Sequence, residues 1–481
     1  MKNIFIIGSG FSSISASTYL AKKNYNVTVF EKNSTIGGRA RQFKKDGFTF
    51  DIGPSWYWMP DVFESYFNDF GKKVSNYYKL DKLNPAYEVY FNKLDSVKIG
   101  DSLEKICIEF DRIEPGSGNI LKKFMKKAEK HYEIAVKDMV YKPGISPLEL
   151  VNTETIARLK YFLTNIKKEV EKDFKNEKLS QILQFPVLFL GAKPSKTPAF
   201  YNFMNHADFG LGTWHPKKGM YSVIKGMKKL AEELGVSFET NQNVEKIIVT
   251  QNLVNGIVVN GENKYCDVLV SGADYNHTES LLEEKFRCYD ESYWERKTFA
   301  PSSLLFFVGL NKKIEKVSHH TLFFDVDFDL HANEIYDNPQ WPSEPLFYGN
   351  FPSITDPSMA PNGKEACFFL IPIAPGIIDS EKTREKYFEI IINRLEKLTN
   401  QSIKDHVLFK ESFCIKDFEK DYNSYKGNAY GLANTLKQTA FLRPKMISKK
   451  VKNLYFTGQL TVPGPGVPPS IISGKIVSDL I

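Results

Sequence analysis

Two largely apolar runs at the beginning of the chain flank a stretch with helical spacing. Residues 4–7 and 27–30 are short and mostly apolar, which is typical of parallel strands buried on both faces. Residues 11–23 lie between them and repeat their apolar positions with a helical period. The pattern therefore predicts a βαβ unit whose first strand starts the chain.

The pattern changes twice after this unit. Between residues 96 and 202 it becomes rich in Lys and Glu with helical spacing, over 121–135 and 153–174 for example, and this part looks inserted. Short strands separated by Pro-rich and Asp-rich turns follow between residues 302 and 373, which predicts an antiparallel sheet. The other predicted helices cover residues 221–234, 381–398 and 470–481, and a strand is predicted over 454–457. Four further strands, over 236–239, 244–249, 254–259 and 268–271, are expected to form one sheet.

The loop between the first strand and the first helix has the sequence Gly8-Ser9-Gly10. Glycine permits a tight turn there and a close approach of a pyrophosphate to the N–H groups at the start of the helix. Ser13 occupies the third small position, and Glu31 ends the second strand, at the spacing of a carboxylate that binds ribose. The loop in its βαβ unit predicts a dinucleotide site, with a plain tight turn beside a solvated acid as the alternative.

A second glycine pair follows Glu31 and distinguishes two classes of dinucleotide. Gly37, Gly38 and Arg39 resemble the second signature of the flavin amine oxidase and desaturase superfamily, in which they lie along the cofactor phosphates. This resemblance implies FAD rather than NAD. Residues 50–60, which contain Gly53 and three aromatic side chains, are similar to the segment that follows this motif in phytoene desaturases.

The end of the chain is similar to the C-terminal signature of the same superfamily. A strand that ends at Gly458 leads through a loop rich in Pro and Gly to Gly466, Val467 and the closing helix. In the family this arrangement brings the helix N-terminus to the flavin ring, where its positive end stabilises negative charge on the reduced flavin. Many relatives carry an acid after the strand-ending glycine, whereas this chain has Gln459, which puts a carboxylate contact with the ribityl chain in doubt.

The resemblance extends over nearly the whole chain, and the chain is similar to the bacterial phytoene desaturase family of carotenoid synthesis. The further stretches are 214–220, 271–275, 319–321, 356–361, 427–432 and 438–444. Lys218 stands where the family pattern has glycine, which leaves the geometry of that loop open.

The resemblance implies an α/β fold with a discontinuous Rossmann-like FAD-binding domain. Residues 1–95, 214–295 and 420–481 are expected to form it, with an inserted α+β substrate- and membrane-binding domain, a mixed antiparallel sheet plus helices, at 96–213 and 296–419. The cofactor-binding residues that it implies are Gly8, Ser9, Gly10, Phe11, Ser12, Glu31, Lys32, Gly37, Gly38, Arg39, Gly53, Val244, Gly458, Gln459, Gly466 and Val467.

The reaction implied by the resemblance needs a two-electron acceptor, which the flavin supplies and no side chain can replace. A hydride passes from a hydrophobic polyene to FAD, a neighbouring proton leaves, and oxygen or a quinone reoxidises the flavin. The predicted activity is desaturation of phytoene toward lycopene, and no catalytic base is assigned. The alternatives are another carotenoid desaturase such as a diapophytoene enzyme, a carotenoid isomerase or ketolase, an amine oxidase, and a non-redox lipid-binding escort protein.

Composition favours an apolar ligand, with 37 Phe, 24 Tyr and 5 Trp in 481 residues. A net charge of +7 with Lys spread along the chain argues against nucleic-acid binding. The five cysteines are scattered, which predicts buried free thiols in a reducing cytoplasm. We expect no metal site, because the adjacent His319 and His320 should point to different faces of a strand. His206 and His215 are interpreted either as residues that approach the substrate or as structural histidines.

The nature of the substrate predicts contact with a membrane. No uninterrupted apolar run of about 18 residues occurs, so no transmembrane helix is expected. A nearly insoluble polyene still has to be collected from a bilayer, and we expect a cytoplasmic protein bound peripherally to a membrane surface. Residues 181–192, preceded by Lys167, Lys168, Lys172 and Lys175, are the candidate contact, with an internal core helix as the alternative.

Overall fold

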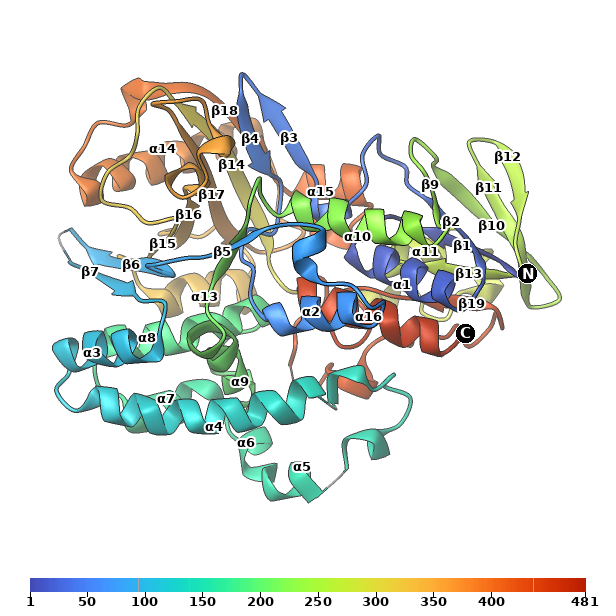
Figure 1. Ribbon diagram of the computed structural model, residues 1–481, viewed down its shortest axis with the longest axis horizontal. Helices are drawn as coiled ribbons and strands as arrows, with labels where there is room; N and C mark the ends of the chain where they lie inside the picture. Colours follow the sequence, from blue (N-terminus) through green and yellow to red (C-terminus); the bar gives the residue numbers. More distant parts are fainter. Residues whose placement is uncertain (94, 138, 152, 436) are drawn as a thin grey trace.

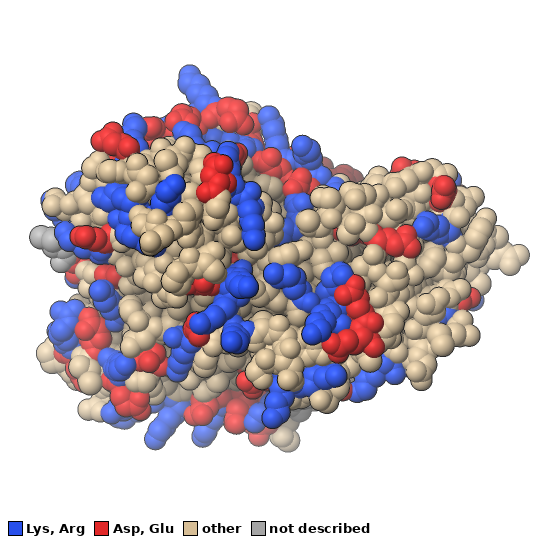
Figure 2. All heavy atoms as spheres, turned by 45° about the horizontal axis from the view of Figure 1, so that its top comes forward, with Lys and Arg blue, Asp and Glu red and all other residues tan. Residues whose placement is uncertain are grey.

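Two lobes meet along the middle of the molecule, as the computed structural model in Figure 1 shows. The structure describes residues 1–93, 95–137, 139–151, 153–435 and 437–481. One lobe holds both termini and a parallel sheet, and the other holds a large sheet with a group of helices below it. On the face drawn in Figure 2, Lys and Arg are interspersed with Asp and Glu, and several basic side chains gather where the lobes meet.

The first lobe is built on a five-stranded sheet in which every neighbouring pair is parallel. Its strands, in spatial order, are β19 (Leu454–Phe456), β13 (Val268–Ser271), β1 (Asn3–Ile7), β2 (Asn26–Phe30) and β9 (Ser237–Glu239). Helix α1 (Phe11–Lys22) connects β1 to β2, so the predicted βαβ unit is confirmed. The closing helix α16 (Val467–Asp479) starts three residues before its predicted position and packs on α1, where Gly474 approaches the carbonyl oxygen of Ser12 too closely for a Cβ atom.

The expectation of a single sheet for the strands between residues 236 and 271 is wrong. Only β9 and β13 join the parallel sheet, whereas β10 (Val244–Thr250), β11 (Leu253–Val259) and β12 (Glu262–Tyr265) form a separate antiparallel sheet. The reason is the turn between β10 and β11, where Gln251 and Asn252 both have positive φ, at 52° and 61°. Such a two-residue turn joins antiparallel neighbours directly, while parallel strands need a long crossover.

The second lobe is built on a seven-stranded sheet, and its antiparallel core over residues 302–373 is confirmed. Its order is β18 (Val407–Phe413), β14 (Ser302–Leu310), β17 (Glu365–Ile373), β16 (Phe347–Asn350), β15 (His320–Phe323), β6 (Tyr87–Asn92) and β7 (Asp95–Ile99). Only the β15–β6 pair of this order is parallel in the described sheet. Helix α14 (Glu381–Thr399) covers it with a row of buried apolar side chains. Strand β6 thus pairs with the second lobe, although the predicted domain boundary at residue 95 assigns it to the first.

Helices fill the space below this sheet. They are α3 (Leu103–Ile113), α4 (Ser117–Lys137), α5 (Thr153–Ala157), α6 (Leu159–Leu163), α7 (Ile166–Asp173), α8 (Glu177–Gln184) and α9 (Phe203–Asn205). The helical stretch predicted over 153–174 is divided among α5, α6 and α7. Thr164 has an extended backbone, and the Asn165 side chain accepts the N–H of Lys168 at 2.9 Å, which starts a new helix at α7.

The remaining helices and strand pairs are distributed over both lobes. They are α2 (Pro60–Asn68), α10 (Tyr221–Glu233), α11 (Tyr275–Ser280), α12 (Glu291–Glu295), α13 (Phe328–Tyr336), α15 (Ile415–Tyr422), and the strand pairs β3 (Gln42–Lys45) with β4 (Phe48–Asp51) and β5 (Leu80–Lys82) with β8 (Trp214–Pro216).

The apolar segment expected at a membrane surface is part of the core instead. Ile182, Leu183 and Val187 are fully buried, so the described side chains of this segment form no exposed apolar face for a bilayer. Apolar packing against neighbouring helices removes these side chains from any surface. No helix formed by the described residues is both long and apolar enough to cross a membrane. The five cysteines are free thiols, four of them buried.

Candidate cofactor and substrate site

One cavity of about 740 Å³ extends from the β1–α1 loop to the seven-stranded sheet. Its walls include every residue that the sequence predicts at the cofactor: Gly8, Ser9, Gly10, Phe11, Ser12, Glu31, Lys32, Gly37, Gly38, Arg39, Gly53, Val244, Gly458, Gln459, Gly466 and Val467. The fold therefore brings together residues 8–53, Val244 and residues 458–467, which are far apart in the chain. Their individual contacts with a cofactor stay a prediction.

The two glycine motifs pack against each other and leave space on one side. Gly8 has a φ of 84° and donates its N–H to Phe30 O at 2.8 Å, which closes the turn after β1. A Cβ atom built on Gly38 would lie 3.2 Å from Gly10 Cα, so the second motif rests on the first. A Cβ atom on Gly10 would meet no protein atom within 4 Å. The space beside Gly10, at the start of α1, fits a pyrophosphate.

Glu31 lies on the cavity wall with its carboxylate held from two sides. Oε2 accepts the hydroxyl of Ser9 at 2.6 Å and its N–H at 3.1 Å, and Oε1 accepts the N–H and the side-chain amide of Asn33, both at 2.9 Å. A ribose hydroxyl has to share this carboxylate with Ser9 and Asn33. Asn33 could not be recognised from the sequence, because its role depends on a turn that no motif describes.

The neighbouring Lys32 lines the cavity, but its ammonium group is directed to α15. Nζ donates to Lys420 O at 2.7 Å and to Asn423 Oδ1 at 3.0 Å. Burial lowers the pKa of Lys32. Its side chain thus fastens the β2 end of the cavity to the second lobe.

Arg39 supplies a buried positive charge in the same cavity. Nη2 donates to Ser424 Oγ at 2.8 Å and to Asn428 O at 3.3 Å, and the guanidinium lies 5.1 Å from the ring centre of Tyr422. Burial lowers the pKa of Arg39, and the nearby Asp274 carboxylate opposes this effect. Its Nε is buried and has no hydrogen-bond partner among the described residues. A buried donor without a partner is costly, so this side chain fits an anionic phosphate.

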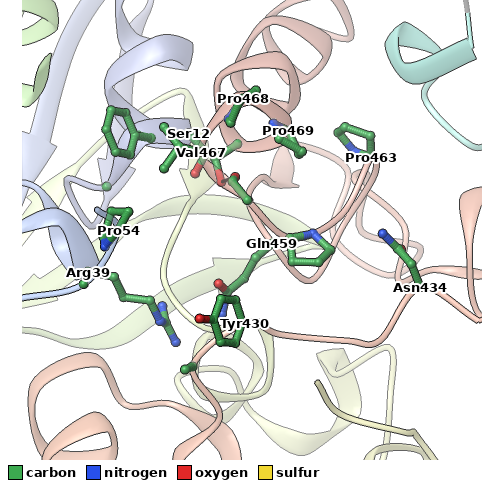
Figure 3. A pocket seen from close by; sticks show the side chains of 18 of the residues that line it. Ser12, Arg39, Pro54, Tyr430, Asn434, Gln459, Pro463, Val467, Pro468 and Pro469 are labelled. Atoms are coloured by element: carbon green, nitrogen blue, oxygen red, sulfur yellow. Dashed lines mark hydrogen bonds between the residues drawn. The ribbon is translucent and has the colours of Figure 1, made fainter. Parts of the chain in front are cut away.

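Gln459, at the position where many relatives have an acid, also contacts Arg39. With its amide oxygen turned toward the donors, it accepts from Arg39 Nη2 at 3.1 Å and from the N–H of Gly431 at 3.3 Å. Figure 3 shows Arg39, Gln459 and Tyr430 converging on one wall, opposite Ser12 and Val467. The amide therefore holds Arg39, a task that an acid in this position could share.

The N-terminus of α16 faces the cavity, as predicted from the C-terminal motif. Gly466 precedes the helix with a φ of 115°, a conformation that favours glycine. Pro468 and Pro469 occupy the first turn and have no N–H group, and the N–H of Ser470 bonds to Gly466 O at 3.0 Å. The positive end of the helix dipole is thus presented mainly by the backbone at Val467.

The loop with the unusual lysine adopts the backbone that the family pattern calls for. Lys218 has a φ of 69°, in the left-handed region where glycine is favoured. Its N–H donates to Asp356 Oδ2 at 2.6 Å, and Asp51 accepts the N–H of Met220 at 2.7 Å. These bonds hold the loop in this left-handed conformation without a glycine at position 218.

Beyond the glycine motifs the cavity is lined mainly by apolar side chains. They are Trp58, Met59, Phe162, Phe185, Leu188, Phe200, Phe203, Leu305, Leu322, Phe324, Phe328, Leu346, Phe347 and Leu370. Most come from the helices and the seven-stranded sheet of the second lobe. This part of the cavity suits a hydrocarbon and excludes water from it.

Histidines contribute little to the cavity surface. His331 lines it, but its Nε2 bonds to Pro372 O at 2.8 Å and its Nδ1 accepts the N–H of Leu346 at 2.9 Å. His206 and His215 are absent from the cavity wall among the described residues, so a direct approach of either to the substrate finds no support there. The expectation that His319 and His320 diverge is wrong, because His319 precedes β15 and their rings lie 4.4 Å apart. Among the described residues no group of three or more His, Cys, Asp or Glu could hold a metal ion.

Comparisons with known proteins agree with this geometry. The model of the flavin-containing amine oxidoreductase family matches residues 12–481. The carotenoid 3,4-desaturase of Haloarcula japonica is 39% identical over 484 residues, which cover 100% of this chain and 98% of that protein. The 4,4'-diapophytoene desaturase (4,4'-diaponeurosporene-forming) of Staphylococcus haemolyticus is 32% identical and covers 99% of this chain and 98% of its own.

Among solved structures, a wild-type putrescine oxidase bound to putrescine superposes with a TM-score of 0.63 at 14% identity. The superposition covers 100% of this chain and 98% of that one, and at this identity it shows the fold alone. The matches confirm the family resemblance, the Rossmann-like α/β fold and FAD as the cofactor. The chain belongs to the flavin-containing amine oxidoreductase family, as a member of its carotenoid desaturases.

Proposed function

We propose that this protein dehydrogenates an acyclic carotenoid precursor, with phytoene desaturation toward lycopene as the leading reaction. The observation that supports it is the single cavity that joins the glycine motifs and Arg39 to an apolar chamber. FAD, when bound, supplies the acceptor for the hydride and its electron pair. The chain contributes the site for the phosphates at Gly10 and Arg39 and a chamber that orients a hydrocarbon and keeps water away.

The aromatic walls of the chamber have a second role in this proposal. Loss of a hydride leaves positive charge on a polyene, and an aromatic face stabilises such a charge by about 1–2 kcal/mol when both are desolvated. Phe185, Phe324 and Phe328 lie along the chamber and can provide such faces. An amine substrate would instead call for a polar or caged amine site, so an amine oxidase is the less supported alternative.

A second candidate reaction is the introduction of a 3,4 double bond into a longer carotenoid. It is favoured by the full-length similarity to a protein named carotenoid 3,4-desaturase at 39% identity. The diapophytoene desaturases, at 32% identity, support a shorter precursor less strongly. All three reactions need the same cofactor and differ in the length and unsaturation of the chain that enters the chamber, with oxygen or a quinone as the final acceptor.

We further propose that the substrate enters from a membrane surface at residues 142–163. Ile145, Leu148, Val151 and Leu163 are 60%, 76%, 59% and 77% exposed, which is unusual for large apolar side chains. They alternate along the chain with cavity-lining residues, namely Lys142, Gly144, Ser146, Glu149 and Phe162. We name Ile145, Leu148, Val151 and Leu163 the apolar rim. An apolar rim at a cavity mouth, with Lys160 exposed nearby, fits peripheral contact with a bilayer on its cytoplasmic side.

Pigment analysis tests the proposed reaction. Bacterial strains that accumulate phytoene, diapophytoene or lycopene receive the gene, and the extracted carotenoids show which strain gains double bonds and how many. In parallel, the purified FAD-loaded protein is mixed anaerobically with each carotenoid in liposomes and with putrescine. The proposal expects loss of the oxidised flavin spectrum with a carotenoid, and longer polyenes once a quinone is added. Loss of the spectrum with the amine alone contradicts it.

A further inference from the structure

A buried phenol and a buried imidazole form a hydrogen-bonded pair beside the apolar chamber. Tyr348 lines the cavity on β16, and its Oη lies 2.6 Å from Nδ1 of His320 on the neighbouring strand β15. The same Oη lies 2.9 Å from Oγ of Ser55, which also lines the cavity. The His320 ring stacks on the indole of Trp56 at 4.0 Å with an interplanar angle of 11°. The pair is therefore fixed in place, and Tyr348 is its member that lines the chamber.

The surroundings determine which partner holds the proton. Asn350 Nδ2 donates to His319 O at 3.1 Å and lies 3.3 Å from the same Nδ1 of His320, so this nitrogen faces two donors. Burial, with His215 adding to it, keeps the pKa of His320 well below its ordinary value, and burial keeps the pKa of Tyr348 well above its own. At neutral pH the phenol is thus protonated and the imidazole is neutral, with Nδ1 accepting the phenol O–H.

Two other titratable groups on the chamber wall, His331 and Glu149, are occupied by backbone partners. Both ring nitrogens of His331 bond to backbone groups, at 2.8 and 2.9 Å. Glu149 accepts the N–H groups of Gly144, Ile145 and Ser146 at 2.8, 3.0 and 3.3 Å. Tyr348 differs from these groups because its own proton has an acceptor, so its oxygen can receive another proton.

We propose, on the basis of the function proposed above, that Tyr348 and His320 together accept the proton that desaturation releases. One carbon of the substrate gives up a hydride with its electron pair to the hydride acceptor. The adjacent carbon gives up a proton to Tyr348 Oη while the phenol proton passes to His320 Nδ1, and the electron pair of that C–H bond becomes the new double bond. A polyenyl cation is a strong acid, so a weakly basic imidazole suffices.

The structure also provides groups along which the proton can leave. The rings of His320, His319 and His215 follow one another at 4.4 and 4.6 Å, and Nε2 of His215 lies 3.3 Å from Asp356 Oδ2. Nε2 of His319 and of His320 is buried and has no hydrogen-bond partner among the described residues, so neither nitrogen is engaged elsewhere. Although burial opposes it, hydrogen bonds from His215 and Ser358 hold the pKa of Asp356 below its ordinary range. The row thus ends at an ionised carboxylate.

Two variants of the FAD-loaded protein test this assignment. Tyr348→Phe removes the phenol oxygen, and His320→Phe removes the acceptor while keeping an aromatic ring on Trp56. Each is expected to slow anaerobic flavin reduction by a bound carotenoid about 100-fold. The double variant should be no slower than the singles, because the two groups act as a unit. Tyr387→Phe is the control variant. It removes the buried hydroxyl of Tyr387 on α14, which donates to Pro342 O at 2.6 Å, and it should keep the wild-type rate.

Readouts that do not depend on turnover separate this role from a structural one. All variants should retain FAD and bind carotenoid in liposomes as the wild type does. Nuclear magnetic resonance of isotope-labelled histidine should show His320 protonated at Nε2, with a signal of Nδ1 that shifts in Tyr348→Phe. Any of three results would overturn the assignment. They are protonation of His320 at Nδ1, a wild-type rate of flavin reduction in Tyr348→Phe, and a rate loss in the double variant that equals the product of the two single losses. If the wild type itself is reduced by no carotenoid, the proposed function fails, and the histidine spectrum still decides whether the pair exists.

Discussion

Gly53 lies with its backbone against the carbonyl oxygen of Arg39, and a Cβ atom at this position would overlap that oxygen. The contact joins the segment that carries Ser55 and Trp56 to the segment that carries the buried guanidinium. Gly53→Ala should therefore displace one segment or the other, since overpacking of a closely packed contact costs about 1–3 kcal/mol. We expect a lower melting temperature and weaker FAD binding, measured by calorimetry and by flavin fluorescence. Unchanged values for both would show that the two segments are not held by this contact.

Gly10→Val should abolish FAD binding without unfolding the protein. The space beside Gly10 is free of protein atoms within 4 Å of an added Cβ, so the side chain would occupy only the space assigned to the pyrophosphate. Gly10→Ala should weaken binding to an intermediate extent. The absorbance of purified protein reports bound flavin, and circular dichroism of the apo forms checks the fold. A normal flavin spectrum in Gly10→Val would refute the pyrophosphate assignment.

Arg39 and Arg41 form a matched pair for the next prediction. Both guanidinium groups lie about 5 Å from the Tyr422 ring, at 5.1 and 5.2 Å, but only Arg39 lines the cavity, while Arg41 pairs with Asp421. Arg39→Gln should weaken FAD binding about 10- to 100-fold, which corresponds to loss of a charge-assisted bond of about 1.5–3 kcal/mol. Arg41→Gln should lower stability and leave FAD affinity near the wild-type value. Equal losses of affinity in the two variants would contradict the role given to Arg39.

The sequence was most informative where local patterns decide the structure. The βαβ unit, the antiparallel core over 302–373 and the Gly8–Gly10 loop follow from apolar runs and glycine spacing, which reflect backbone conformation directly, whereas the other cofactor walls were implied by the family resemblance. Gly10 and Gly38 could be assigned to one site because their motif already places them along a dinucleotide. The residues expected at the cofactor therefore all line one cavity, while their individual contacts with FAD stay a prediction.

Features that depend on tertiary contacts could not be predicted in this way. The hairpin at Gln251 and Asn252 splits off a separate sheet through two left-handed residues that are not glycine. Residues 181–192 have the composition of a membrane contact, but their burial is set by neighbouring helices. The Tyr348–His320 pair joins two strands that are close only in the folded sheet, so a motif search finds His319-His320 and misinterprets the direction of the rings.

Glu279 should make stability depend on pH. It is 2% exposed on α11 and accepts the N–H groups of Cys288 at 2.7 Å and Tyr289 at 3.3 Å, and burial raises its pKa to about 7. The pKa of Glu279 is higher in the folded than in the unfolded protein, so the folded state binds the proton more tightly. The contribution of this proton to folding stability is complete below about pH 4.5 and is lost as the pH rises to about 7. Relative to wild type, Glu279→Gln should gain roughly 3 kcal/mol between pH 4.5 and 8 in urea unfolding. The exposed Glu284→Gln serves as the control, and parallel curves for wild type and Glu279→Gln would contradict the prediction.

Membrane attachment should depend on the apolar rim and not on residues 181–192. We expect the wild-type protein to float with vesicles that contain anionic lipid, and added salt to reduce flotation only in part, because apolar burial and lysine attraction both contribute. Replacing Ile145, Leu148 and Val151 by Ser removes three exposed apolar side chains without touching the core.

Each of these side chains contributes up to about 1.5 kcal/mol when buried, so the triple variant should lose about tenfold or more in vesicle affinity. Ile378→Ser is the matched control, because Ile378 is 86% exposed but precedes α14, on the opposite side of the molecule from α5 and α6 in Figure 1. Desaturation of a detergent-dispersed substrate should stay near the wild-type rate in both variants, while desaturation of vesicle-bound substrate should fall only in the triple variant. If the triple variant floats as well as Ile378→Ser does, the substrate enters by another route and the apolar rim has no role in membrane contact.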